Sequence, residues 1–172
     1  MSLPPRLDAG PIIDALVRNG VDFVLVGGLA GTLQGSSYPT YDMDVAYSRD
    51  RENLGRLVRA LETLDVKLNN APADVPFALD ERTLENGANF TFDTRYGRFD
   101  ILGHVPGVSS YNELRDHSQA AKLEGREIRM ASIDHLIAMK RAANRPKDKL
   151  MVEEYLVIAD EQERARRSGK QG

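Results

Sequence analysis

Apolar residues recur along this chain with two different periods. Helical spacing predicts four long helices, which begin at Pro11, after Asp50, after Ser132 and at Lys147. In the last helix the apolar side would be formed by Met151, Tyr155, Leu156 and Ala159. Shorter helical segments are predicted at 29–33, 80–86 and 111–116. Extended segments are expected between these helices.

Short apolar or alternating runs predict strands. They lie at 23–26, 42–45, 66–70, 89–94, 98–103, 119–123 and 126–130. Residues 95–97 would form a three-residue loop that closes a hairpin between two of these strands. In that hairpin, Phe99 and Ile101 alternate toward the core, as do Phe90 and Phe92. Asp100 is out of phase with them and should point to the opposite face of the sheet.

These elements predict an α/β (α+β) fold, with a mixed, mostly antiparallel sheet and helices mainly on one face. The length of 172 residues fits one domain over 1–172, with 1–7 and 161–172 loosely ordered. There is no apolar run long enough to span a membrane and no charged-then-apolar leader, so we expect a cytoplasmic protein with no membrane partner.

The composition excludes several kinds of catalytic and metal site. The chain has no cysteine, which excludes disulfides, thiol catalysis and cysteine-ligated zinc. A formal net charge of −3 argues against a protein that binds nucleic acid over its whole surface, so an RNA contact would need a local basic patch. Such a group exists at Lys140, Arg141, Arg145, Lys147 and Lys149. Its ordinary role would be a solvated helix surface.

Two carboxylates separated by one residue give the strongest chemical signal. Asp42 and Asp44 lie on a predicted strand, where alternate side chains share one face. Carboxylates that point together repel each other, and a hard cation such as Mg²⁺ relieves that repulsion. Upstream, Gly27 and Gly28 end an apolar strand and precede a short helix, where backbone N–H groups can hold a phosphate. The segment therefore predicts a site for a metal and a phosphate.

These features, in this order, resemble the signature of the DNA polymerase β-type nucleotidyltransferase superfamily, in the form found in minimal and AbiEii-type toxin nucleotidyltransferases. The matching residues are Gly27, Gly28, Gly35, Thr40, Asp42 and Asp44, with Asp100 as a third carboxylate. A segment at 134–148 is also similar to these enzymes, so the resemblance covers residues 21–156. It differs at Gly28, where many relatives carry serine, and at Tyr38, where many carry arginine.

The resemblance implies an enzyme that moves an NMP from an NTP, such as ATP, to an acceptor hydroxyl and releases pyrophosphate. Asp42, Asp44 and Asp100 would be the catalytic residues and would hold Mg²⁺ or Mn²⁺. The triphosphate contacts implied are Gly27, Gly28, Thr32 and Lys140. The acceptor would be the 3′ end of a tRNA or a protein, in a toxin–antitoxin or phage-defence setting with a cognate partner. Antibiotic-modifying relatives also make an aminoglycoside a candidate.

Several alternatives stay open. The chain could be a catalytically weak nucleotide-binding partner or antitoxin, or a dinucleotide-binding domain, although the G-x-G-x-x-G spacing is absent. Lys140 could cover the core with its stem, Asp148 could be a helix cap, and Arg98 could pair with Asp100. The histidines at 104, 117 and 135 are expected to be surface or packing residues, because none has metal-ligand spacing such as H-x-x-x-H.

Overall fold

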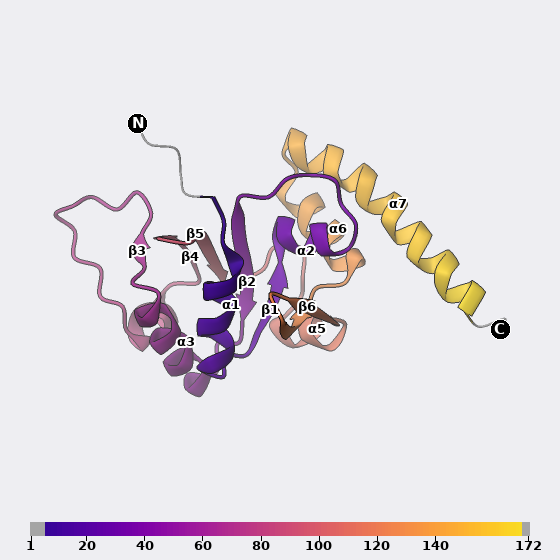
Figure 1. The fold of residues 1–172 in the computed structure, drawn as a ribbon. Helices are drawn as coiled ribbons and strands as arrows, with labels where there is room; N and C mark the ends of the chain where they lie inside the picture. The colour runs from indigo at the N-terminus through magenta and orange to yellow at the C-terminus, as the bar shows by residue number, and fades with distance from the viewer. Residues whose placement is uncertain (1–5, 170–172) are drawn as a thin grey trace.

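The strands of this chain form one sheet. The computed structural model describes residues 6–169, and Figure 1 shows the sheet with its flanking helices. The strands are β1 (Phe23–Val26), β2 (Asp42–Tyr47), β3 (Lys67–Leu68), β4 (Asn89–Thr94), β5 (Gly97–Leu102), β6 (Gln119–Leu123) and β7 (Arg126–Met130). Their order across the seven-stranded sheet is β3-β4-β5-β2-β1-β7-β6.

Most neighbouring strands are antiparallel, and two pairs are parallel, β2 with β5 and β1 with β7. The expected mixed, mostly antiparallel sheet is therefore confirmed. The helices are α1 (Ala9–Arg18), α2 (Gly27–Leu33), α3 (Arg51–Thr63), α4 (Glu81–Asn86), α5 (Tyr111–Asp116), α6 (Ile133–Ala143) and α7 (Pro146–Gly169). Helix α3 packs against both α1 and α4, and α6 packs along α7.

Alternation on β2 and β5 divides the two faces of the sheet. Met43 and Val45 on β2, with Phe99 and Ile101 on β5, are completely buried. Because successive side chains on a strand point to opposite faces, the residues between them lie on the other face. That face carries the aspartates of both strands, and the phase predicted for Asp100 is confirmed.

Several element boundaries differ from those predicted. Helix α2 begins at Gly27 rather than at 29, and β3 has two residues rather than five. The loop between β4 and β5 is the two residues Arg95–Tyr96, because Gly97 already pairs with Thr94. Gly97 has a φ of +119°, which glycine adopts without a steric penalty, so β5 starts immediately after the turn.

Helix α7 is longer than predicted. It starts at Pro146, where the fixed φ of proline suits the first helical position, and it continues to Gly169 instead of fraying after 160. Ion pairs one turn apart support this last part, including Arg164 with Asp160 at 2.9 Å and Arg167 with Glu163 at 3.1 Å. Of the C-terminal end predicted to be loose, 161–172, residues 170–172 lie outside the described residues. Of the N-terminal end predicted to be loose, 1–7, residues 1–5 lie outside them as well.

The buried side of α7 also differs in one residue. Met151 and Tyr155 are buried as expected, but Leu156 is 45% exposed and Ile158 takes the buried place. Because they are spaced by four and three residues, 151, 155 and 158 lie on one face of the helix, whereas 156 lies outside that face.

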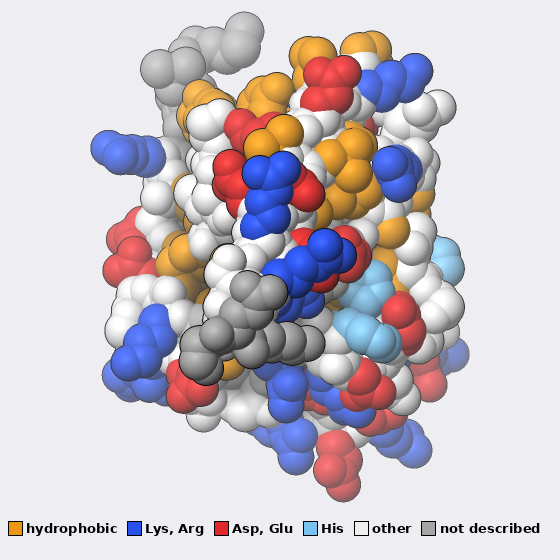
Figure 2. Space-filling model, turned by 90° about the vertical axis from the view of Figure 1, so that its right-hand side faces the viewer, with side chains coloured by type: hydrophobic (Ala, Val, Ile, Leu, Met, Phe, Trp, Pro, Cys, Tyr) orange, Lys and Arg blue, Asp and Glu red, His pale blue; other side chains and the backbone are white. Residues whose placement is uncertain are grey.

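In Figure 2, which views the molecule from the right-hand side of Figure 1, acidic and basic side chains are interspersed over the surface. Within residues 6–169 no helix is both long and apolar enough to cross a membrane.

One buried polar side chain ties α3 to the two central strands. Asn53 is 2% exposed and accepts a hydrogen bond from the backbone N–H of Asp22 at 2.7 Å. Its Nδ2 donates to the carbonyl oxygens of Asp22 at 3.0 Å and Ser48 at 2.7 Å. Asp22 precedes β1 and Ser48 follows β2, so this one amide holds both strand ends.

Replacing Asn53 with alanine should therefore remove this partner from the N–H of Asp22 and the carbonyl of Ser48, while the carbonyl of Asp22 keeps its bond from the N–H of Ser48. We expect Asn53→Ala to lower the free energy of unfolding by about 1–3 kcal/mol, measured by urea unfolding at constant slope. The control is Asn69→Ala, because within residues 6–169 the Asn69 side chain bonds only to the exposed Asp93, and this change should alter stability by less than about 0.5 kcal/mol. Equal effects of the two substitutions would contradict this role for Asn53.

Candidate active site

The pairing of β2 with β5 brings the three predicted carboxylates together. Asp44 lies directly beside Asp100 in the parallel register, and Asp42 lies two residues before Asp44 on the same face. Neighbouring strands are about 4.8 Å apart, so these side chains are close neighbours. All three line one pocket of about 550 Å³. The carboxylates that the sequence placed on two separate strands are thus one cluster.

Electrostatics in this cluster favour protonation. Burial raises the pKa of Asp44 well above its ordinary value, and the neighbouring Asp100 and Asp42 raise it further, while Lys140 opposes them. Burial also raises the pKa of Asp42, again helped by Asp100 and opposed by Arg98 and Lys147. Both shifts have the sign expected when like charges are crowded in a poorly hydrated place. The nearby positive charges therefore offset the burial and crowding of these carboxylates only in part.

Asp100 forms no ion pair with a basic side chain of residues 6–169, and one of its two carboxylate oxygens lacks a partner there. Its Oδ1 is buried and makes no hydrogen bond within that part of the chain. Arg98, considered from the sequence as its partner, instead has its Nε 4.0 Å from Oδ1 of Asp93. Asp93 faces Arg98 directly across the β4–β5 pair, so the alternative in which Arg98 pairs with Asp100 is not supported. A buried polar atom without a partner is costly, which makes this oxygen a candidate ligand atom.

The donor set fits a hard divalent cation. Ionised carboxylates only accept hydrogen bonds, and Mg²⁺ and Mn²⁺ take oxygen ligands of this kind. A cation beside Asp42, Asp44 and Asp100 would relieve their mutual repulsion and give the orphaned oxygen of Asp100 a partner. The residues present therefore suit the cation that the sequence predicted.

Two glycines keep the floor of the pocket open. Gly27 has a φ of +71°, and a Cβ on it would lie 2.2 Å from Oδ2 of Asp44. A Cβ on Gly28 would lie 2.9 Å from Oγ1 of Thr40. Only glycine fits at either position without movement of the neighbouring side chain. The threonine hydroxyl thus lies near where a side chain of residue 28 would project.

Another part of the pocket wall comes from α6 and the start of α7. The Nζ of Lys140, on α6, is 3.3 Å from Oδ1 of Asp148, whose side chain is 1% exposed. Asp148 also accepts hydrogen bonds from the backbone N–H and the Nε of Arg145, at 3.1 and 2.7 Å. These bonds, chiefly those from the Arg145 side chain, hold the pKa of Asp148 below its ordinary value.

This arrangement assigns roles that the sequence left open. Asp148 is the third residue of α7 and bonds back to the N–H of the residue before the helix, which is a capping contact. The same carboxylate holds the ammonium of Lys140, which lines the pocket and acts electrostatically on Asp44. Lys140 therefore does more than cover the core with its stem.

Some predicted residues lie elsewhere. Thr32 is on the exposed side of α2, where its hydroxyl donates to the carbonyl of Gly28 at 3.1 Å, and it does not line the pocket. It is four residues beyond Gly28, so helical geometry directs its hydroxyl back along α2. Tyr38 packs against the core, and His104 is exposed. Of the basic group, Lys140, Arg145 and Lys147 line the pocket, whereas Arg141 and Lys149 do not.

Other residues of the pocket wall were not predicted from the sequence, and two of them are polar. Tyr41, 68% exposed, and Asn89, at the start of β4, both line the pocket. Tyr41 is flanked by two residues of the carboxylate signature, and that adjacency could have indicated it. Asn89 carried no such signal, because only the pairing of β4 with β5 brings it to the pocket.

Several solved structures share the fold of this chain. The lincosamide antibiotic adenylyltransferase LnuA, bound to lincomycin, matches at a TM-score of 0.59 and 14% identity, over 89% of this chain and 99% of its own. The antibiotic-resistance factor ANT(2″)-Ia matches at 0.54 and 14%, over 94% and 91%. A candidate nucleotidyltransferase from Thermotoga maritima matches at 0.55 and 16%, over 84% and 88%.

No family model matches the chain, and no curated protein matches it in sequence. The structural similarity shows that the chain has the nucleotidyltransferase fold, as its resemblance implied. It does not bear on the AbiEii-type subdivision, which stays a prediction.

The raised pKa of Asp44 has a testable effect on stability. A carboxylate whose folded pKa lies above its unfolded pKa binds more protons in the folded state, so its contribution falls as pH rises through that interval. We expect Asp44→Asn to melt at a higher temperature than wild type near neutral pH without metal, with a smaller gain at acidic pH. About 1 kcal/mol corresponds to about 2–4 °C in a domain of this size. A lower melting temperature across the whole range would contradict the repulsion inferred for the cluster.

Asp148 should show the opposite behaviour, because its pKa is lowered. Its stabilising contribution is present above the ordinary carboxyl pKa and is lost as pH falls through the folded value. We expect Asp148→Asn to lower the free energy of unfolding by about 1–3 kcal/mol at neutral pH, with a smaller difference in acid. The matched control is Asp160→Asn, on the exposed part of the same helix, where the change should stay within about 0.5 kcal/mol. Indistinguishable variants would rule out the capping role.

Proposed function

We propose that this protein is a metal-dependent nucleotidyltransferase that transfers an NMP from an NTP to an acceptor hydroxyl and releases pyrophosphate. The observation that supports this most strongly is the arrangement of one pocket. Three carboxylates from β2 and β5 line one wall, and a lysine held by Asp148 lines another. Crowded anions suit divalent cations, and a fixed cation suits the phosphates that such ions bind.

In this proposal Asp42, Asp44 and Asp100 hold two Mg²⁺ or Mn²⁺ ions. When bound, these ions would offset the charge of the triphosphate and promote deprotonation of the acceptor hydroxyl. Asp44 has Asp42 as its neighbour along β2 and Asp100 as its neighbour across the strand pair, so it is suited to contact both ions. Asp100, with its orphaned oxygen, is suited to hold the ion that serves the acceptor.

The triphosphate would lie between the floor and the far wall of the pocket. The first N–H groups of a helix have no acceptor within that helix, so those of Gly27 and Gly28 are suited to phosphate oxygens. Lys140 would contribute a charge whose position is fixed by Asp148. Lys147 and Arg145 line the same pocket and would add positive charge at its entrance.

The matching structures, the pocket volume and the net charge favour a small polyhydroxylated molecule as the acceptor. Two of the matching structures are antibiotic-modifying or antibiotic-resistance proteins, one with lincomycin bound, and a further ANT(2″)-Ia structure contains adenylyl-2″-tobramycin. The pocket volume of about 550 Å³ falls within the range for small-molecule sites. The net charge of −3 disfavours a large RNA. The sequence also predicts a tRNA 3′ end or a protein hydroxyl as acceptor, in a toxin–antitoxin setting. These acceptors stay predictions, and the label-transfer experiment described below includes them.

A second candidate is a nucleotide-binding partner with little turnover. It is favoured by Gly28, which lacks the hydroxyl of many relatives, and by Tyr38, which brings no charge to the pocket. The hydroxyl of Thr40 near Gly28 weakens the first of these arguments. Nucleotide binding without transfer to any acceptor would support this candidate.

The proposal is tested by label transfer. Wild-type protein is incubated with each α-labelled NTP, Mg²⁺ and separate pools of aminoglycosides, lincosamides, total tRNA and cell lysate. We expect labelled product in one pool, and a loss of about 10²-fold or more in Asp42→Asn and Asp44→Asn, because the cation is no longer held. Asp160→Asn is the control for loss of one acidic charge and should keep full activity. Full transfer by both site variants would exclude this assignment.

Asp100 distinguishes transfer from simple binding. We expect Asp100→Ala to keep most of the stabilisation by ATP with Mg²⁺, because Asp42 and Asp44 remain, while label transfer falls by about 10²-fold or more. Thermal-shift titration and label transfer are measured on the same preparation. If Asp100→Ala lost nucleotide binding and transfer in equal measure, the separate role given to Asp100 would be wrong.

A further inference from the structure

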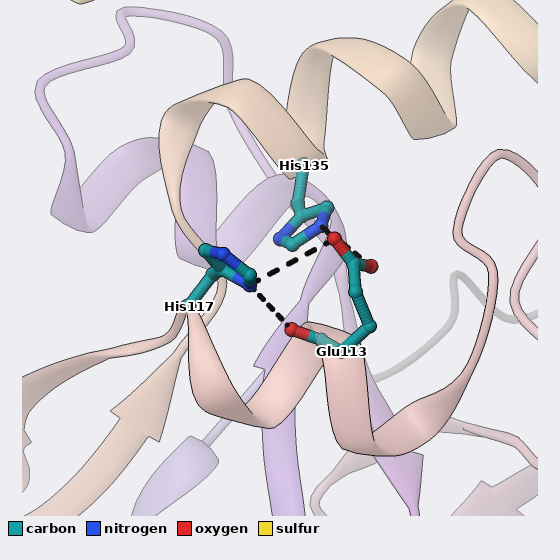
Figure 3. A group of neighbouring side chains, drawn as sticks. All are labelled: Glu113, His117 and His135. Carbon is teal, nitrogen blue, oxygen red and sulfur yellow. Dashed lines mark hydrogen bonds and ion pairs between the residues drawn. The ribbon is translucent and has the colours of Figure 1, made fainter.

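A second group of metal-ligating side chains lies away from the carboxylate pocket. Glu113 on α5, His117 at the end of α5, and His135 on α6 point toward one another in Figure 3. One ligand atom from each side chain lies within 4.8 Å of the others. None of the three lines the carboxylate pocket. The group therefore belongs to a different part of the molecule.

The spacing of the ligand atoms fits a small cation. The Nε2 of His135 is 2.9 Å from both carboxylate oxygens of Glu113, and the Nδ1 of His117 is 3.8 Å from Oε1. Zinc binds imidazole nitrogen and carboxylate oxygen at about 2.0–2.2 Å, so two ligands on a tetrahedral ion are about 3.3 Å apart. The separations of Glu113 from His135 and from His117 lie on either side of that value, and all three ligand atoms lie within 4.8 Å of one another. Small side-chain movements would bring the three atoms into place.

The surroundings also suit a metal. The side chain of His135 is 12% exposed, and its Nδ1 lies 3.3 Å from Oγ of Ser132, a polar neighbour that can orient the ring. Within residues 6–169, the carboxylate of Glu113 forms ion pairs only with these two histidines. Its charge is therefore not already neutralised by a lysine or arginine there.

His117 can adopt the tautomer that metal binding through Nδ1 requires. Its Nδ1 lies 2.9 Å from the backbone carbonyl of Glu113, and a carbonyl only accepts, so Nδ1 carries the proton in this contact. Metal binding through Nδ1 needs the other neutral tautomer, with the proton on Nε2. The His117 side chain is 65% exposed, so exchange with water can move that proton. On the face of the molecule shown in Figure 2, histidine side chains lie next to acidic ones.

We propose that Glu113, His117 and His135 form a binding site for a transition-metal ion of the Zn²⁺ class, distinct from the Mg²⁺ or Mn²⁺ site of the carboxylates. Two imidazoles and one carboxylate form a set that Zn²⁺ and Co²⁺ prefer over Mg²⁺. Water would complete the coordination. The ion would connect the end of α5 to the first turn of α6, the helix whose later turn carries Lys140. It would thereby brace one wall of the carboxylate pocket.

Co²⁺ is the probe, because four-coordinate Co²⁺ absorbs strongly in the visible region and Mg²⁺ is silent there. The full chain is titrated with Co²⁺ in excess Mg²⁺, followed by competition with Zn²⁺. We expect one Co²⁺ per chain with the intense spectrum of a four-coordinate site, displaced by Zn²⁺. We expect the affinity to fall by about 100-fold or more in His135→Ala and Glu113→Gln. Asp44→Asn should bind Co²⁺ as wild type does, because the two sites are separate.

Circular dichroism of each variant distinguishes loss of ligands from loss of fold. Glu113→Gln keeps the shape of the side chain, so it serves if His135→Ala fails to fold. Absence of stoichiometric Co²⁺ binding by wild type would overturn the proposal. Binding that is unchanged in folded Glu113→Gln, or lost only in Asp44→Asn, would overturn it as well. Neither result depends on transferase activity.

Discussion

The repulsion among three aspartates is the constraint on which the pocket depends. The parallel pairing of β2 with β5 fixes Asp44 beside Asp100, and the apolar residues on the other face prevent the strands from turning over. Because Asp44 fills the space beside Gly27, that position must be glycine. Raised pKa values at Asp42 and Asp44 are the electrostatic consequence. The fold thus maintains a cluster that divalent cations would stabilise.

The positive charge facing this cluster is also fixed by the fold. Asp148 caps α7 and at the same time holds the ammonium of Lys140. One carboxylate therefore contributes both to helix stability and to the position of a cation in the pocket. Lys140 is close enough to oppose the raised pKa of Asp44, but it does not reverse it. The pocket accordingly has an anionic wall, which would hold the metal in the proposed function, and a cationic wall, which would hold phosphate.

Periodicity within single segments predicted the carboxylate side of the pocket. A period of two placed Asp42 and Asp44 on one face, and the phase of the β4–β5 hairpin placed Asp100 on the same side of the sheet. Contacts between distant segments could not be predicted in this way. The pairing of Arg98 with Asp93, the hold of Asp148 on Lys140 and the grouping of Glu113 with His135 each depend on tertiary packing. Thr32 lies outside the pocket because of where α2 starts, which periodicity fixes poorly.

The central claim is that the three aspartates together form a divalent-cation site that binds nucleotide. Electron paramagnetic resonance of Mn²⁺ tests it directly, because free and bound Mn²⁺ give different signals. The account predicts that wild type binds Mn²⁺, that a non-hydrolysable ATP analogue tightens this binding, and that Mn²⁺ tightens binding of the analogue by the same factor. Asp44→Asn should lose this coupling. Equal Mn²⁺ binding by wild type and Asp44→Asn, with no effect of the analogue, would contradict the account.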